Sequence, residues 1–172
     1  MLCLLILPLS SAAPATFQNS PLWQAWTMVE IADYVVMQSG RGVVNRDRYL
    51  IGVVGNDEVR RYLGEVLKDK GVKQIQRRPV EIVEIKPAEA AVKALTVDLL
   101  FVGSGGEPAV RPVLKKCADA GVVTIGETKG FTVAGGVFRF DVDARKLIYH
   151  RANLDGAPYG LHRRFRRYMP SE

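Results

Sequence analysis

The chain has 172 residues, of which 48% are hydrophobic and 24% charged. These proportions exclude disordered and fibrous proteins, and the length predicts one domain with its own core. The net charge of +6 is confined to one stretch, because residues 145–167 contain seven lysines and arginines and one acid, whereas the rest of the chain contains seventeen of each sign. No stretch has the ~18 uninterrupted apolar residues of a membrane-spanning helix.

The first fifteen residues have the pattern of a secretory signal peptide. An apolar run at 2–9 is followed by small residues and by the triplet Ala13, Pro14, Ala15, after which we expect cleavage. Residues 16–172 then form a single exported domain. The basic residues that usually begin such a peptide are missing, so either the true start lies upstream or the stretch is a buried element of an intracellular protein.

Cysteine usage agrees with export. Cleavage removes Cys3 and leaves Cys117 as the one cysteine of the exported chain, which excludes an intrachain disulfide. Cys117 occupies an apolar position of a predicted helix, so we expect a buried thiol, and a bridge to a second chain is the alternative.

Hydrophobic spacing predicts helices and strands that alternate along the chain. Trp23 lies off the apolar face of the first helix, where it either contacts a partner or covers an edge of the core. The predicted elements in chain order are a helix at 23–37, a strand at 49–55, a helix between Asn56 and Gly71, a strand at 80–85, a short helix at 87–95, a strand at 98–103, a helix at 106–121 and a strand at 122–127.

This alternation requires a mostly parallel sheet with helices on both faces. The remainder of the chain differs, since residues 136–142 and 146–152 both resemble strands and are separated by a short turn. That arrangement predicts an antiparallel hairpin at the sheet edge. The expected fold class is therefore α/β, in a single domain.

A last predicted helix begins near Asp155 and has a basic outer face. Leu161, Phe165 and Tyr168 face inward in this prediction, and four arginines face outward. Clustered arginine binds phosphate, but no nucleic-acid-binding module surrounds this cluster. An anionic lipid surface or an acidic partner therefore fits better, and a merely solvated face is the alternative. The candidate partner-binding residues are Arg163, Arg164, Arg166 and Arg167.

The stretch FVGSGGEP is similar to part of a dinucleotide-binding fingerprint, because three glycines follow a predicted strand and open a helix. However, Pro108 stands where the third glycine of the fingerprint is needed, and the stretch follows the third strand rather than the first. A tight turn is therefore favoured over an anion site at the start of the helix.

Other catalytic and metal-binding patterns are missing from the sequence. There is no Walker A run, His150 and His162 lack the spacing of a zinc site, and Ser104 lacks the flanking residues of a nucleophile elbow. Asp141 and Asp143 share one side of a predicted strand, which solvated acids explain as well as catalysis does. The sequence thus predicts a protein that is not an enzyme and that has no metal or cofactor.

Residues 121–161, with the upstream stretches YLIGVVG and DLLFVG, resemble the YfiR-like family of bacterial periplasmic proteins. The shared features are a strand that ends in a turn, a phenylalanine, a glycine pair before a strand, and then Asn-Leu and a helical leucine. In this chain they are Thr124, Ile125, Gly126, Phe131, Gly135, Gly136, Asn153, Leu154 and Leu161. The likeness extends from the first helix to the last.

The resemblance implies an exported, non-catalytic α/β protein, often dimeric, that regulates a membrane signalling partner. In the member that gives the family its name, this partner is an inner-membrane diguanylate cyclase, which the periplasmic protein holds inactive. Two departures limit the transfer: Val97 stands where family members commonly have a cysteine, and the last helix is rich in arginine rather than leucine. Control by a disulfide is therefore not carried over.

Two functions from different classes follow. The first is a periplasmic regulator that binds a membrane-bound diguanylate cyclase or histidine kinase through the hairpin and the last helix. The second is a small-ligand sensor or solute-binding domain, with its ligand beyond the carboxyl ends of the parallel strands, at Gly55–Asp57, Gly103–Glu107 and Gly126–Lys129. The candidate ligand-binding residues in those loops are Gly103, Ser104, Gly105, Gly106, Gly126, Glu127 and Thr128. A third function, an intracellular nucleotide-using enzyme, requires that the N-terminus is retained.

Overall fold

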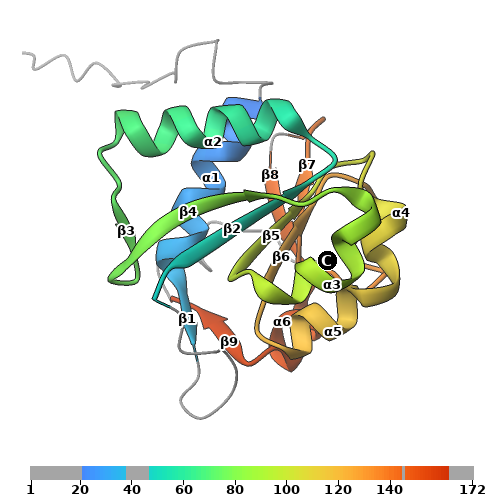
Figure 1. The fold of residues 1–172 in the computed structure, drawn as a ribbon. Coiled ribbons are helices and arrows are strands. Elements are labelled where there is room, and N and C mark those ends of the chain that lie inside the picture. The colour runs from blue at the N-terminus through green and yellow to red at the C-terminus, as the bar shows by residue number, and fades with distance from the viewer. Residues whose placement is uncertain (1–20, 38–46, 145, 163–172) are drawn as a thin grey trace, which may run out of the picture.

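Buried apolar strands alternate with helices along the chain, and this order produces a mostly parallel sheet with helices on both faces (Figure 1). The computed structural model describes residues 21–37, 47–144 and 146–162. Its elements are α1 (Pro21–Tyr34), β1 (Val35–Met37), β2 (Tyr49–Val54), α2 (Asp57–Asp69), β3 (Gln74–Ile75), β4 (Arg78–Glu84), η2 (Pro87–Glu89), α3 (Ala90–Lys93), η3 (Ala94–Thr96), β5 (Leu99–Val102), α4 (Glu107–Val110), η4 (Arg111–Val113), α5 (Leu114–Asp119), β6 (Val123–Gly126), β7 (Phe138–Asp141), β8 (Lys146–Tyr149), α6 (Arg151–Gly156) and β9 (Tyr159–Leu161).

The main sheet has seven strands in the order β3-β4-β2-β5-β6-β7-β8. The five central strands run parallel, and β3 and β8 pair antiparallel at the two edges. Counted along the chain, the parallel strands lie in the order 2-1-3-4-5, which is one of the two common arrangements of doubly wound sheets. The predicted fold class and the predicted edge hairpin, β7 with β8, are confirmed.

The sheet separates two hydrophobic cores, as β5 illustrates. Its residues Leu99 and Phe101 belong to the core under α1 and α2, whereas Leu100 and Val102 belong to the core under α3, α4 and α5. All four side chains are buried, because successive residues of a strand point to opposite faces and both faces are covered. This burial explains why the strand reads as a continuous apolar run.

Helix α2 begins and ends where the sequence predicts. The Asn56 side chain accepts a hydrogen bond of 3.0 Å from the Val59 amide, which satisfies one of the free donors at the helix start. Gly71 follows the last turn with a φ of +63°, a conformation that glycine adopts without steric cost.

The first helix is shorter than the spacing of its apolar residues predicts. It ends at Tyr34, and Val35–Met37 form β1, which pairs antiparallel with β9. The Gln76 side chain donates hydrogen bonds to the carbonyl oxygens of Ala32 and Val35, and so caps the helix end from a distant turn. The prediction of a helix through Met37 was wrong because these partners lie far away in the sequence.

The predicted start of the last helix, near Asp155, was also wrong. Helix α6 starts at Arg151 and ends at Gly156, and Leu161 lies in β9 instead of on a helix face. Phe165, Tyr168 and the four candidate arginines lie outside the described residues. The helix predicted at 106–121 is divided into α4, η4 and α5, since Pro112 has no amide proton to continue the helical hydrogen bonds.

Trp23 and Cys117, for which the sequence left two alternatives each, both pack in or against the core. The Trp23 ring packs edge-on against Phe140, with 5.0 Å between ring centroids, so it covers the core. Cys117 is fully buried, and this burial raises the pKa of its thiol to about 11. A thiol in this position is inert, in agreement with the expected buried residue.

The phenylalanine ring at position 131 is held between two glycines. A Cβ atom added to Gly126 would lie 2.2 Å from the ring, and one added to Gly136 would lie 2.1 Å from it. Phe131 is fully buried, so the ring cannot move aside into solvent. These glycines therefore serve packing: they leave room for an aromatic ring against the end of β6.

We expect Gly126→Ala to lower the free energy of unfolding by about 1 to 3 kcal/mol, because the added methyl group overpacks a closed core. Gly64→Ala is the matched control, because Gly64 lies in α2 with nothing within 4 Å of its Cβ position. Alanine should raise the free energy of unfolding there by about 0.5 to 1 kcal/mol, since it favours the helix more than glycine does. Urea unfolding followed by circular dichroism measures both changes. Equal effects at the two positions would contradict the packing role.

Candidate functional site

The carboxyl ends of the parallel strands form the edge where doubly wound sheets bind ligands. The loops that leave this edge include residues 55–56 after β2, residues 103–106 after β5 and residues 127–137 after β6. The strand order reverses between β2 and β5, so the crevice expected for a ligand lies between the first two loops.

In this structure the main chains of the first two loops fill that crevice. A Cβ atom on Gly55 would lie 2.2 Å from the Gly106 nitrogen, and one on Gly103 would lie 2.6 Å from the Gly55 oxygen. The Gly103 amide also donates a hydrogen bond of 2.8 Å to the Val54 carbonyl. The glycines of the GSGG stretch therefore permit one loop to lie directly against the other, as in the tight turn that the sequence favours.

Glu127 ties the three loops and α1 together. Its Oε1 atom accepts hydrogen bonds from the side-chain amides of Asn56, at 2.9 Å, and Gln24, at 3.1 Å. Its Oε2 atom accepts one of 3.0 Å from the Ser104 amide. A carboxylate with three donors is strongly held, because hydrogen bonds to a charged acceptor are the stronger kind.

A second carboxylate, that of Glu107, is buried at the start of α4. The Arg111 guanidinium lies 2.5 Å from one of its oxygens, one helical turn further on, and the Thr128 hydroxyl donates a hydrogen bond to the other. The ion pair compensates the cost of placing a charge where only 6% of the residue is exposed. Glu107 ends the stretch Gly103–Glu107 in which the sequence places a possible ligand, but its pairing with Arg111 and Thr128 was not predicted.

The structure thus brings together the candidate residues of two loops, but through contacts within the chain. Ser104 and Thr128 bond to glutamates, and Gly126 makes room for the Phe131 ring. Gly105 lies loosely over Gly55, with 3.5 Å between its Cβ position and the Gly55 oxygen. Ligand binding by these loops stays a prediction.

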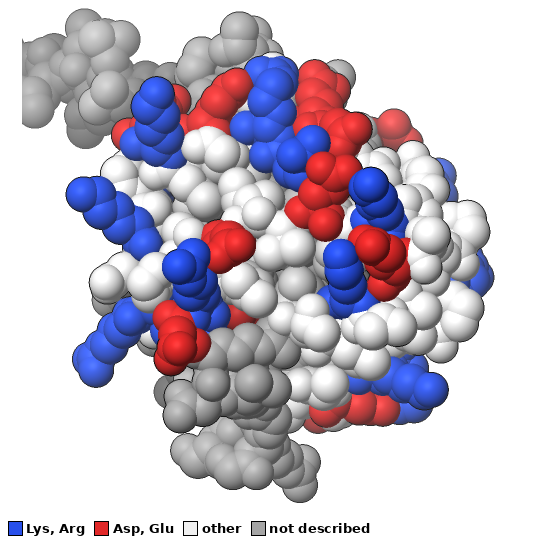
Figure 2. Space-filling model, in the orientation of Figure 1, with Lys and Arg blue, Asp and Glu red and all other residues white. Residues whose placement is uncertain are grey.

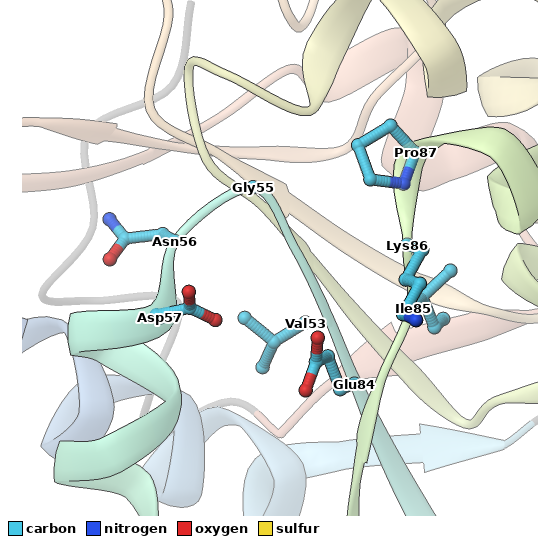
Figure 3. Close-up of a pocket in the computed structure, with 8 residues that line it drawn as sticks. All are labelled: Val53, Gly55, Asn56, Asp57, Glu84, Ile85, Lys86 and Pro87. Atoms are coloured by element: carbon cyan, nitrogen blue, oxygen red, sulfur yellow. The ribbon is translucent and has the colours of Figure 1, made fainter.

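A pocket of about 310 Å³ opens on the other side of β2, between the carboxyl ends of β2 and β4 (Figure 3). The loop after β2 forms one wall, and the segment that follows β4 forms the other. The residues that line it are Val53, Gly55, Asn56, Asp57, Glu84, Ile85, Lys86 and Pro87. Sequence reasoning named Gly55–Asp57 and missed Glu84 to Pro87, although these residues also follow a strand of the parallel sheet.

Charges of both signs lie around this pocket. Arg60 pairs with Asp57 at 3.3 Å and with Glu84 at 3.4 Å, and the exposed Lys86 adds a second cation. On the molecular face that Figure 2 shows, acidic and basic side chains are likewise interspersed. The pocket therefore suits a polar ligand with both a donor and an acceptor group better than a strongly charged one.

The described part of the chain contains neither a metal-binding cluster nor a membrane-spanning helix. Across residues 21–37, 47–144 and 146–162, no three histidines, cysteines or acids are close enough to hold a metal ion. In the same residues, no helix combines the length and the apolar character that crossing a bilayer requires.

Comparison with known proteins gives one match. A family model described as YfiR/HmsC-like matches residues 23–157, which extend from α1 to the residue after α6. No curated protein matches the chain.

We expect Glu127→Ala to cost about 1.5 to 3 kcal/mol of unfolding free energy, because three donors lose a charged acceptor. The control is Glu65→Ala, which removes an exposed ion pair with Arg61 and should cost less than about 0.5 kcal/mol. Urea unfolding compares the two variants. A loss at Glu127 no larger than the loss at Glu65 would show that the three hydrogen bonds do not hold the loops together.

Proposed function

The chain belongs to the YfiR/HmsC-like family, and on this basis we propose that it is an exported regulatory protein that binds and modulates a membrane-bound signalling partner. The match over residues 23–157 is the observation that carries the proposal. Membership suggests a periplasmic regulator of diguanylate cyclase signalling, and the cyclase is the partner that we propose for this chain. A histidine kinase is the other class of partner that the sequence suggests.

Regulation of this kind is a difference in affinity. The protein inhibits a cyclase only if it binds the inactive state of the cyclase more tightly than the active state. A difference of about 1 to 3 kcal/mol is enough for a useful response. No bond needs to be made or broken by the regulator itself.

The carboxyl edge of the sheet supports a non-catalytic role. The Glu127 carboxylate accepts three hydrogen bonds from the protein, and the Glu107 carboxylate is paired with Arg111. A general base needs a carboxylate that reaches a substrate proton, and both of these act in holding loops. We therefore propose that the chain is a binding protein and not an enzyme.

Export is part of the proposal. The apolar run at 2–9 and the triplet Ala13, Pro14, Ala15 support it as the pattern of a signal peptide. These residues lie outside the described part of the structure. In a regulator of a membrane receptor, export would place the α/β domain on the side of the membrane that receives external signals.

Deleting the gene should raise cellular cyclic di-GMP several-fold, because the cyclase loses its inhibitor. The full chain supplied from a plasmid should restore the original level, and a matched variant without residues 2–12 should fail, since it is not exported. Mass spectrometry of nucleotide extracts measures the level. An unchanged level on deletion, together with no membrane protein crosslinked to the chain, would exclude the cyclase as the partner.

A small-ligand sensor is the second candidate function, and the pocket between β2 and β4 favours it. The volume of about 310 Å³ is at the lower end of the range for small-molecule sites. Asp57, Glu84 and Lys86 supply charged groups at its walls. The two functions are compatible, because a ligand that binds here could change affinity for the partner.

We expect a screen of periplasmic metabolites to find a small polar molecule that raises the melting temperature by a few degrees, as ligand binding to the native state does. Lys86→Ala should abolish the increase, because it removes a charge from the pocket wall. Lys116→Ala removes an exposed lysine from α5 and serves as the control, which should keep the full increase. An increase that survives in Lys86→Ala would place the ligand elsewhere.

A further inference from the structure

Strand β4 has a neighbour along only part of its outer edge. The edge strand β3 has two residues, which pair with Pro79 and Arg78. Next to them, the Val80 amide donates a hydrogen bond of 3.2 Å to the Lys73 carbonyl. Within the described part of the chain, no strand pairs with the outer side of the remaining residues, Ile82–Glu84, here called the open edge (Figure 1).

The main-chain groups of the open edge point away from the sheet. The Ile85 amide donates to the Val53 carbonyl of β2 at 2.9 Å, whereas the Val80 amide donates to the other side. Along a strand these groups alternate between the two sides, so the amides and carbonyls of Ile82 and Glu84 point outward, as the Val80 amide does. A row of such groups is where a further strand can pair.

The open edge also presents apolar side chains on both faces of the sheet. Ile82 packs against the core under α1 and α2, and Val83 packs against the core under α3, α4 and α5. Both side chains are only half-buried, because the sheet ends here. An added strand would cover the rest of their apolar surface, and this burial favours binding.

Charges at this edge favour an acidic occupant. The acids of β4, Glu81 and Glu84, are paired with arginines. Lys73 lies at one end of the open edge, beside Val80, and Lys86 follows the other end. Both lysines are exposed, and no ion pair is described for either. An acid on a neighbouring strand would be repelled beside the glutamates and attracted beside the lysines.

We propose that the open edge holds an extended segment of a protein partner, which adds a strand to the sheet beside β4. The segment has apolar or neutral residues in its middle, beside Ile82 and Val83, and acidic residues at its ends, beside Lys73 and Lys86. In this mode of binding the main-chain hydrogen bonds supply affinity and the side chains supply specificity. The inference names a contact surface for the proposed regulator, and in that respect it rests on the proposed function.

A second copy of the chain fits the open edge less well. Because β3 already lies beside Arg78 and Pro79, two copies could pair only through the open edge of each. Two-fold symmetry makes this pair antiparallel, so Lys86 of one copy would approach Lys73 of the other. Like charges brought together in this way are destabilising.

The test uses the full purified chain and a fluorescent synthetic peptide of about eight residues, in which valine and threonine alternate between aspartates at both ends. Fluorescence anisotropy should show saturable binding below about 1 mM. The same peptide with lysine in place of aspartate should bind about tenfold more weakly. Equal binding of the two peptides, or no saturable binding of the acidic one, would overturn the proposal. Neither result changes the cyclic di-GMP level expected on gene deletion, so the proposed function is tested separately.

Two double variants test the lysines. Replacing Lys73 and Lys86 by glutamine should weaken binding of the acidic peptide several-fold. The control replaces Lys116 on α5 and Lys146 on β8, which are also exposed and lie away from β4, and it should change binding by less than about twofold. Equal losses in the two variants would contradict the proposed position of the acids.

A proline at position 84 tests the main-chain contact. Glu84→Pro removes an outward amide and leaves the hydrogen bonds between β4 and β2 in place, as proline at a sheet edge does. Glu84→Ala removes the same carboxylate and keeps the amide. The acidic peptide should bind Glu84→Pro several-fold more weakly than Glu84→Ala, provided that circular dichroism shows both variants folded. Equal affinities would show that the peptide does not pair with this edge.

Amide hydrogen exchange locates the peptide without any substitution. The amides of Ile82 and Glu84 should exchange rapidly in the free chain and at least about tenfold more slowly with saturating acidic peptide. The Val83 amide faces β2 and should be protected in both cases. Unchanged exchange at Ile82 and Glu84 would place the peptide elsewhere and overturn the proposal. Protection in the free chain that is lost on dilution would also overturn it and assign the edge to a second copy.

Discussion

The contact between the main chains of Gly55 and Gly106 determines the form of the whole carboxyl edge. It holds the loop after β2 against the loop after β5, and α2 and α4 start from these two loops. The same approach brings Asn56 and the Ser104 amide within hydrogen-bond distance of Glu127. A side chain at Gly55 would force the loops apart, because its Cβ atom would lie 2.2 Å from the Gly106 nitrogen, and backbone cannot move aside as a side chain can. A Cβ atom on Gly106 would lie 2.5 Å from the Val54 side chain and 2.9 Å from its backbone.

This contact also decides where a ligand could bind. In a doubly wound sheet the crevice at the reversal of strand order usually receives the ligand, and here the protein itself occupies it. The open space lies one strand further, between β2 and β4, where no glycine-rich loop closes it. The glycines that suggest an anion site in the sequence are thus the ones that let the two loops lie against each other.

The sequence was sufficient for the elements that depend on local pattern. Strands such as β5 are buried on both faces and read as continuous apolar runs, and the cap of α2 is visible as Asn56 before the helix and Gly71 after it. The sequence was insufficient where contacts with distant residues determine the secondary structure of a segment. Val36 continues a helical pattern but pairs with Gly160, and no periodicity encodes that contact.

In the candidate site, too, the sequence predicted what depends on strand order but not what depends on contacts between distant residues. Because parallel strands end at one edge, the order of the predicted strands is enough to place Ser104, Glu127 and Thr128 in neighbouring loops. Their partners do not follow from that order, since hydrogen bonding between Glu127 and Gln24 joins residues 103 positions apart. Glu84 and Lys86 were missed because β4 alternates polar and apolar residues, so its final acid looks like one more solvated residue of the strand.

The packing of the Phe131 ring against Gly126 and Gly136 restricts which substitutions these three positions can accept. Because both glycines lie against atoms of the same ring, a side chain at either position would collide with it. A larger residue at either glycine position fits this packing only if the side chain at position 131 becomes smaller. The three positions therefore form one packing unit, and we expect a substitution at one of them to require a compensating substitution at another.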